Sequence, residues 1–405
     1  MANVGTYLDW RADVSFAGAP FNEVDNAILS LLAYTEFEGV VPGVGGKKLS
    51  IEAVTKQFFQ MHTTEELMKS ESTNKEAPFL LKKMAGSGRF GGTKIGDYVA
   101  VVDNETQTQF SAITYYLPDD SVYIAYRGTD TTLIGWKEDM NMCFMPEMPG
   151  HRKAIDYLER IMSRVPEDKT IYVGGHSKGG HFALYASTFC KKKFQDRIKV
   201  VYSNDGPGLM KAQVASEAYK NIYKRVVHII PDTSIFGVLM EHRSKPTIIQ
   251  TASTGVDAHN IFDWQVLGNK FERSDGQKDS SIVLDKVIKK WMGSVEPESR
   301  KLFWEAIYAG MEAGGETLGD LLANPVKAAA LIIKSVESLP EENKLQFRKV
   351  MKMGGASGTE NIKEFLEAKF SKEGLAHRHE EKEEEKIEKK KAKKNAKLTP
   401  KQVHV

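Results

Sequence analysis

A serine lies at the centre of a glycine-rich segment, Gly175–Gly179, which reads Gly-His-Ser-Lys-Gly and fits the pattern G-x-S-x-G. The strand-forming residues 170–173 precede it, and residues 181–189 follow with apolar side chains at helical spacing. A strand, a sharp turn and a helix form the setting in which this pattern presents a nucleophile. We predict that Ser177 attacks a carbonyl carbon and that the amide of Lys178, at the helix N-terminus, stabilises the oxyanion. The alternative is a glycine-rich turn between a strand and a helix in which the serine has no catalytic role.

A serine hydroxyl needs an oriented histidine as its base, and in α/β-hydrolases the chain order is nucleophile, acid, histidine. Asp232 and Asp205 each come shortly after a predicted strand that follows Ser177. We predict Asp232 as the acid and rank Asp205 second, as a residue that also lines the site. His259 follows the last predicted strand and is the predicted base, with His242 as its main rival.

A second oxyanion donor is expected from a loop after an earlier strand. Residues 127–130 read Arg-Gly-Thr-Asp and follow the strand-like run 122–126. The amide of Thr129, together with its hydroxyl, is the predicted donor. Trp136 and His176 are further candidates for the lining of the site.

Strand and helix patterns alternate over about 160 residues around this segment. Such alternation predicts an α/β protein with a mainly parallel sheet and helices on both faces. Residues 21–34 have Asn22 as a plausible N-cap and predict an amphipathic helix, and residues 151–165 predict another. The predicted strands are residues 98–102, 110–116, 122–126, 170–173, 198–202, 225–230 and 248–249.

The chain changes character near residue 275. Residues 1–274 predict the hydrolase-like domain, and residues 275–370 predict a helical C-terminal region. Residues 371–405 are rich in Lys and Glu and lack apolar residues for a core, which predicts a charged tail that is disordered or a solvated helix. A solubilising role is the expected one, and the alternative is weak contact of the lysines of this tail with an anionic membrane surface or with nucleic acid.

The net charge and the cysteine count argue against several classes of protein. The chain of 405 residues has a net charge of +2 and two cysteines, Cys143 and Cys190. These values favour a reducing compartment and argue against a disulfide framework, a four-cysteine zinc site and nucleic-acid binding. The N-terminus has no signal-peptide pattern, and no apolar run is long enough to span a membrane. We expect a cytoplasmic protein that needs no metal or organic cofactor.

Several motifs together resemble the class 3 (fungal-type) lipase branch of the α/β-hydrolases. The motifs are Tyr126-Arg-Gly-Thr129, Trp136-Lys-Glu-Asp139 and Gly175–Gly179. Two more segments, Pro20–Asp25 and Asn204–Gly208, resemble a bacterial lipase-like family whose function is largely unassigned. The resemblance covers about residues 15 to 270. It implies an α/β-hydrolase fold and a triad formed by Ser177, Asp232 and His259.

The expected function is therefore hydrolysis of carboxylic esters, such as lipid or lysolipid esters, by a serine hydrolase. A thioesterase or amidase would use the same residues. A protein of a different class, a catalytically silent binding or scaffolding module on the same fold, is the second hypothesis. The oligomeric state has no signal in the sequence.

Overall fold

The structure is a computed structural model that describes residues 2–70, 72, 74–130, 132–142, 144–255, 257–279, 281, 282, 301, 305 and 308. The chain divides into two compact units, residues 1–350 and 351–405, and every described residue belongs to the first. The predicted helical region 275–370 lies almost entirely outside the described residues, and the predicted tail 371–405 lies wholly outside them. Cys143 is also outside them, whereas Cys190 is a buried free thiol.

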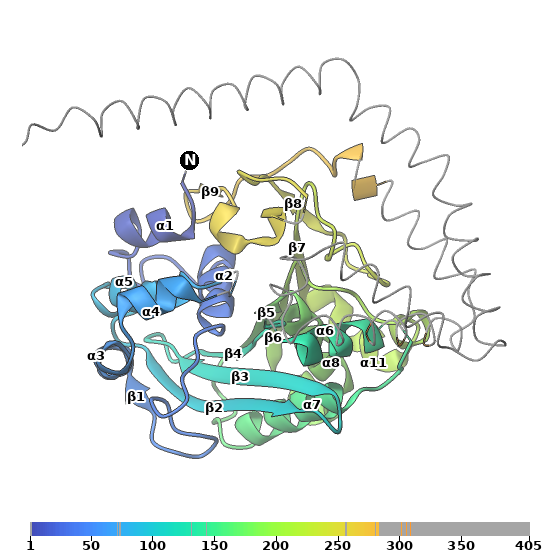
Figure 1. Ribbon diagram of the computed structural model, residues 1–405, viewed down its shortest axis with the longest axis horizontal. Helices are drawn as coiled ribbons and strands as arrows, with labels where there is room; N and C mark the ends of the chain where they lie inside the picture. The colour runs from blue at the N-terminus through green and yellow to red at the C-terminus, as the bar shows by residue number, and fades with distance from the viewer. Residues whose placement is uncertain are drawn as a thin grey trace, which may run out of the picture. The chain divides into compact units, whose positions relative to one another are not determined.

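The centre of the fold is an eight-stranded sheet in the order β1-β2-β3-β4-β5-β6-β7-β8 (Figure 1). Strands β1 to β4 pair antiparallel, and β4 to β8 pair parallel. A separate two-stranded sheet joins β9 and β10. The strands are β1 (Leu49–Ser50), β2 (Lys94–Asp103), β3 (Thr108–Tyr116), β4 (Val122–Tyr126), β5 (Ile171–His176), β6 (Ile198–Asn204), β7 (Val226–Pro231), β8 (Thr247–Ile249), β9 (Val266–Leu267) and β10 (Lys270–Phe271).

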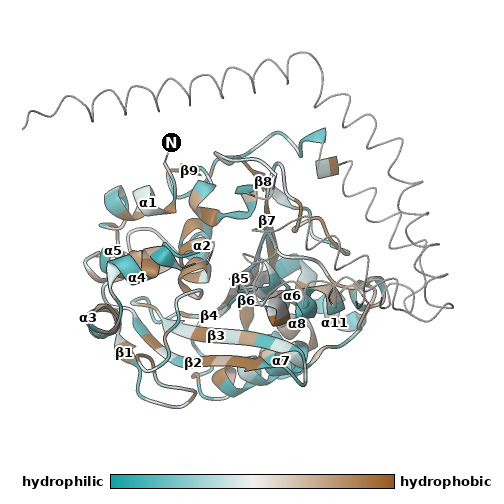
Figure 2. Cartoon of the chain, viewed as in Figure 1, coloured by the Kyte–Doolittle hydropathy of each residue, from teal (hydrophilic) through white to brown (hydrophobic). Residues whose placement is uncertain are grey.

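Helices cover the sheet. The α-helices are α1 (Val4–Trp10), α2 (Glu23–Leu32), α3 (Ile51–Met61), α4 (Thr64–Lys69), α5 (Leu80–Ala85), α6 (Leu133–Asn141), α7 (Pro149–Met162), α8 (Lys178–Phe189), α9 (Lys192–Gln195), α10 (Lys211–Val214) and α11 (Glu217–Ile222). Short 3₁₀ turns include η3 (Asp257–His259) and η4 (Ile261–Asp263). Figure 2 shows hydrophilic and hydrophobic residues on the same helix in α7, as expected of a helix with one buried face.

Two apolar cores form, one on each face of the sheet. Because neighbouring residues of a strand point to opposite faces, Tyr123 and Ala125 of β4 join one core, and Ile124 and Tyr126 join the other. The first core includes residues of α1, α2, α3 and α5, and the second includes residues of α7, α8 and α11. The parallel strands follow one another in order across the sheet, so right-handed crossovers place α7, α8 and α11 on a single face. In Figure 1, α2 and α8 accordingly lie on opposite sides of the central strands.

The predicted fold class is confirmed, and each predicted strand coincides with β2 to β8 to within a few residues. The side chain of Asn22 caps α2 by accepting hydrogen bonds from the amides of Val24 and Asp25. Strands β1, β9 and β10 have two residues each and were not predicted, because a pair of residues is too short for an alternating pattern. Within the described residues, no helix combines the length and apolar character that crossing a lipid bilayer requires.

Candidate active site

Ser177 lies at the tip of a sharp turn between the buried strand β5 and helix α8. Its backbone has φ 58° and ψ −131°, a conformation that residues other than glycine rarely adopt. The turn can be tight because a glycine has no side chain and lets neighbouring backbone segments approach closely. A Cβ on Gly179 would lie 2.9 Å from the carbonyl carbon of Arg127, which belongs to the predicted oxyanion segment. The strained serine between a strand and a helix is the geometry that the G-x-S-x-G pattern predicts.

The register between β5 and β6 brings an acid next to the serine. His176, the last residue of β5, lies opposite Asn204, the last residue of β6. The Ser177 amide donates a hydrogen bond of 3.0 Å to the Asn204 carbonyl oxygen. Asp205 follows Asn204 and has a positive φ of 47°, so it also sits at a sharp turn at the carboxyl edge of the sheet. Ser177 and Asp205 therefore each come directly after one of two adjacent parallel strands, β5 and β6.

Asp205 holds the imidazole of His259. The distance from His259 Nδ1 to Asp205 Oδ2 is 2.6 Å, and the Asp205 side chain is only 1% exposed. The other carboxylate oxygen, Oδ1, accepts hydrogen bonds from the Ser234 hydroxyl at 2.5 Å and the Gly237 amide at 3.0 Å. Because a carboxylate accepts, it selects the neutral tautomer of His259 in which Nδ1 carries the proton and Nε2 has the lone pair that a general base requires.

Asp232, the acid that the sequence favoured, lies elsewhere. Its carboxylate is 3.3 Å from Lys278 Nζ and 3.5 Å from Ser274 Oγ, while its amide donates to the Ile249 carbonyl oxygen. Asp232 follows β7, which is one strand farther from β5 than β6 is. The acid beside His259 is thus Asp205, the second-ranked candidate. The loop after β7 serves the site in another way, since it supplies the two donors from Ser234 and Gly237.

The other histidines have different partners. His242, the rival base, stacks on His228, with ring centroids 3.9 Å apart and an angle of 11° between the rings. His151 and His181 share a buried hydrogen bond of 2.7 Å between their Nε2 atoms. Burial lowers the pKa of His228 and of His181 to about 4, so both are neutral near pH 7.

His176, a predicted lining residue, lies between Tyr34, which follows α2, and the loop that carries His259. Its Nε2 is 2.8 Å from the backbone carbonyl oxygen of His259, and its Nδ1 is 2.9 Å from the hydroxyl of Tyr34. Its ring centroid is 4.2 Å from that of His259. Burial, together with the neighbouring His259, holds the pKa of His176 well below its usual range.

The two predicted oxyanion donors are linked by side chains. Thr129 donates a hydrogen bond of 2.6 Å to Asp139 of α6. The Lys178 ammonium is 3.7 Å from Asp139 and 2.7 Å from Glu138, and it donates to Gln109 at 2.8 Å. Burial raises the pKa of Asp139 to about 6, and the Lys178 charge opposes this rise. The structure therefore connects the segment after β4 with the first turn of α8.

The backbone amides of Thr129 and Lys178 have no hydrogen-bond partner among the residues that the structure describes. Unpaired amides of this kind are what an oxyanion site offers. Trp136 lies on α6, between the Thr129 segment and Asp139, and is partly buried. Nothing in the described contacts brings the Trp136 ring to Ser177.

The Ser177 hydroxyl and His259 form no hydrogen bond in the part of the chain that is described, although the His259 loop contacts His176, the neighbour of Ser177. Such catalytic contacts are often long without substrate. No group of three or more metal-ligating side chains occurs within the described ranges.

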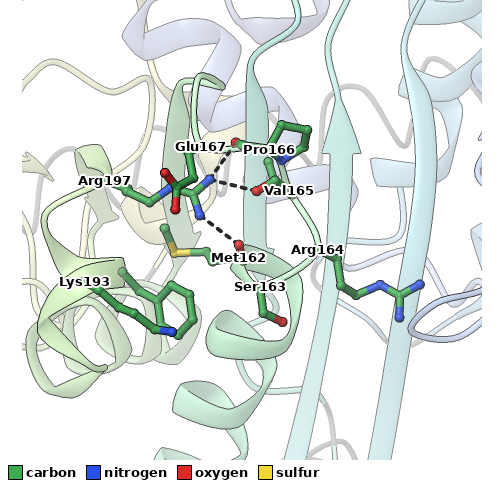
Figure 3. A pocket seen from close by; sticks show the side chains of 9 residues that line it. Met162, Ser163, Arg164, Val165, Pro166, Glu167, Lys193 and Arg197 are labelled. Carbon is green, nitrogen blue, oxygen red and sulfur yellow. Dashed lines mark hydrogen bonds between the residues drawn. The ribbon is translucent and has the colours of Figure 1, made fainter.

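One cavity, of about 400 Å³, lies away from this site (Figure 3). It lies beyond the C-terminal end of α7, at the edge of the sheet where β5 and β6 begin. The guanidinium of Arg197 donates to the carbonyl oxygens of Met162, Val165 and Pro166, so it caps the end of α7 (Figure 3). This role accounts for the partly buried Arg197, and the cavity shares no residue with the candidate site.

Residues 84–309 match the sequence model of the Mbeg1-like family, which covers more than half of the chain and includes Ser177, Asp205 and His259. The chain belongs to the Mbeg1-like family. This assignment confirms the expected kinship with lipase-like α/β-hydrolases. No protein among the curated sequences matches the chain.

Two solved structures are similar to parts of the chain. One is a mutant form of MDLA from Penicillium cyclopium, with 15% identity over 63% of this chain and 86% of that protein, at a TM-score of 0.34. The other is M37 lipase, with 16% identity over 44% of this chain and 70% of that protein, at a TM-score of 0.31.

Proposed function

We propose that this protein is a serine hydrolase that cleaves carboxylic esters, with Ser177 as nucleophile, His259 as general base and Asp205 as the acid that orients it. The observation that carries the proposal is the buried contact of 2.6 Å between His259 Nδ1 and Asp205, one residue beyond the strand end that pairs with the serine turn. Membership of a lipase-like family supports the same reaction class.

In the first half of the reaction, Ser177 Oγ attacks the ester carbonyl carbon. Nε2 of His259 takes the hydroxyl proton, and the resulting imidazolium is stabilised by the buried carboxylate of Asp205. The imidazolium then donates this proton to the leaving alcohol, and an acyl-enzyme remains on Ser177. A water molecule, deprotonated by the same imidazole, releases the carboxylic acid and restores the serine.

The negative charge that develops on the carbonyl oxygen needs donors close to Ser177. The amides of Lys178 and Thr129 fit this role, because neither has a partner among the described residues and because the Thr129 segment packs on the first turn of α8. Loss of one such donor costs about 3 kcal/mol of transition-state stabilisation, or roughly a hundredfold in rate.

A fluorophosphonate probe tests the proposal directly, because it phosphonylates only a serine that an adjacent base activates. The full chain should acquire one adduct, located on Ser177 by peptide mass spectrometry, and lose hydrolysis of p-nitrophenyl esters in parallel. The Ser177→Ala variant should remain unlabelled, and His259→Ala should label much more slowly. An unmodified wild-type protein beside a fully labelled control hydrolase would refute the proposal.

A further inference from the structure

We propose that Tyr34 and His176 act as a positioning pair that holds the loop of the general base His259 against the nucleophile turn. The inference rests on the proposed function. Neither side chain is a catalytic residue in it, and the pair acts through the backbone of His259. The feature that points to this role is a chain of two short hydrogen bonds that ends on the residue carrying the base.

The direction of the two hydrogen bonds follows from the acceptor at their end. The backbone carbonyl oxygen of His259 can only accept, so His176 Nε2, at 2.8 Å, carries a proton and donates it. His176 is 2% exposed and its pKa lies well below the usual range, so the ring is neutral and Nδ1 has a lone pair. Tyr34, at 2.9 Å, therefore donates its hydroxyl proton to Nδ1. The hydroxyl of Tyr34 thus fixes the tautomer in which His176 can bind the loop.

Other contacts also hold the loop of His259, and its residues Ala258 and Ile261 are fully buried. Trp264 Nε1 donates to the carbonyl oxygen of Ala258 at 3.0 Å, which anchors the residue before the base. The His259 side chain itself contacts Asp205, and its ring lies 4.3 Å from that of Phe236, centroid to centroid. His176 is the residue of the nucleophile turn whose side chain binds the His259 backbone, so it relates the position of the base to that of Ser177.

Tyr34 reaches this position from the N-terminal layer, just after α2. Its hydroxyl also lies 3.4 Å from the His176 carbonyl oxygen and lies over Gly128, where a Cβ would collide with it. A single hydroxyl therefore touches the segment before Thr129 and the turn before Ser177. Such a contact positions two parts of a site without touching substrate.

Two amide substitutions separate this role from simple packing. In glutamine the amide nitrogen is as many bonds from Cα as Nε2 is in histidine, so His176→Gln retains a donor for the His259 carbonyl oxygen. In asparagine the amide nitrogen corresponds to Nδ1, so His176→Asn keeps a polar amide of the same chemistry but does not reach that oxygen. The two variants form a matched pair in which only the reach of the donor differs.

The expected result is a difference in kcat between the two variants. His176→Asn should lower kcat about a hundredfold, with KM within about threefold, because the base is misplaced while substrate contacts stay. His176→Gln should keep kcat within about tenfold of the wild type. Tyr34→Phe, which retains the ring, should lower kcat about fivefold in the same direction. Fluorophosphonate labelling rates should fall in the same order, and thermal unfolding of each full-length variant checks the fold.

Three outcomes overturn the inference. Equal kcat values for the two amide variants would show that the donor to the His259 carbonyl oxygen has no role. A change confined to KM would also refute it, as would a Tyr34→Phe variant with unchanged kcat and labelling. If the asparagine variant fails to fold, His176→Gln and Tyr34→Phe decide alone. These failures differ from failure of the proposed function, which would leave the wild type itself unlabelled.

Discussion

Replacing Asp205 by asparagine changes one atom of the candidate site, and the structure predicts how the new amide would orient. In the native site Asp205 Oδ1 accepts from the Gly237 amide at 3.0 Å and from the Ser234 hydroxyl at 2.5 Å. An asparagine keeps its carbonyl oxygen on these donors and turns its NH₂ toward His259 Nδ1. That nitrogen must then accept, so the proton moves to Nε2 and the base loses the lone pair that takes the serine proton.

The size of the effect follows from the alternative orientation. A flipped amide would place its NH₂ against the buried N–H of Gly237 and leave two donors facing each other. Leaving a buried donor without a partner costs roughly 1–3 kcal/mol, so the productive tautomer is populated about ten- to a hundredfold less. Loss of the negative charge beside the imidazolium adds to this factor. We expect Asp205→Asn to lower kcat/KM about 10³- to 10⁴-fold, which equals about 4–5.5 kcal/mol of transition-state stabilisation.

The assay compares Asp205→Asn with Asp232→Asn, a matched substitution of the other carboxylate, in hydrolysis of the best p-nitrophenyl ester at pH 7.5. Asp232 binds Lys278 and Ser274 instead of a histidine, so its variant should keep kcat/KM within about threefold of the wild type. Urea unfolding of both variants controls for the fold. A decrease in kcat/KM of less than tenfold for Asp205→Asn, or an equal decrease for Asp232→Asn, would refute the assignment of Asp205 as the acid.

The free energy of unfolding should decrease as the pH falls below 6.5. Burial lowers the pKa of His151 to about 2 and that of His181 to about 4, whereas a histidine in the unfolded chain titrates near 6.5. The unfolded state therefore binds protons that the folded state does not. At pH 5 each of the two histidines lowers the free energy of unfolding by up to about 2 kcal/mol. Midpoints of urea unfolding that stay constant from pH 7 to pH 5 would contradict this prediction. Arg89→Met should destabilise the protein by about 3–5 kcal/mol in urea unfolding, because the carboxylate of Asp25, 0% exposed, loses its cation. Lys192→Ala removes an ion pair between exposed side chains and serves as the control that changes stability little.

The order of the elements and the nucleophile turn could be predicted from sequence because each has a local signal. The β-branched runs give β4 to β7, and the glycines around Ser177 mark the turn. His259 could be chosen over His242 because it follows the last predicted strand, whereas His242 precedes it. These predictions depend on short-range patterns that the three-dimensional structure preserves.

The choice of acid could not be made in the same way. Asp205 and Asp232 both follow a parallel strand after Ser177, so both satisfy the rule of chain order. Which of them meets His259 depends on where the loop of residues 250–265 crosses the edge of the sheet, and no local pattern gives that position. Tyr34 had no signal for the same reason, since it is an ordinary residue after a helix until the fold brings it to His176.

The arrangement of buried side chains around Ser177 suggests why its two neighbours in sequence are almost fully enclosed. His176 and Lys178 are 2% and 1% exposed, although a polar residue beside a surface turn would ordinarily face solvent. His176 binds the loop of His259, and the Lys178 ammonium lies by Asp139, which accepts from Thr129. The loop of His259 and the Thr129 segment therefore both contact residues of the turn that carries Ser177. A shift of that turn would carry the base and the oxyanion segment with it, so their positions relative to Ser177 would be retained.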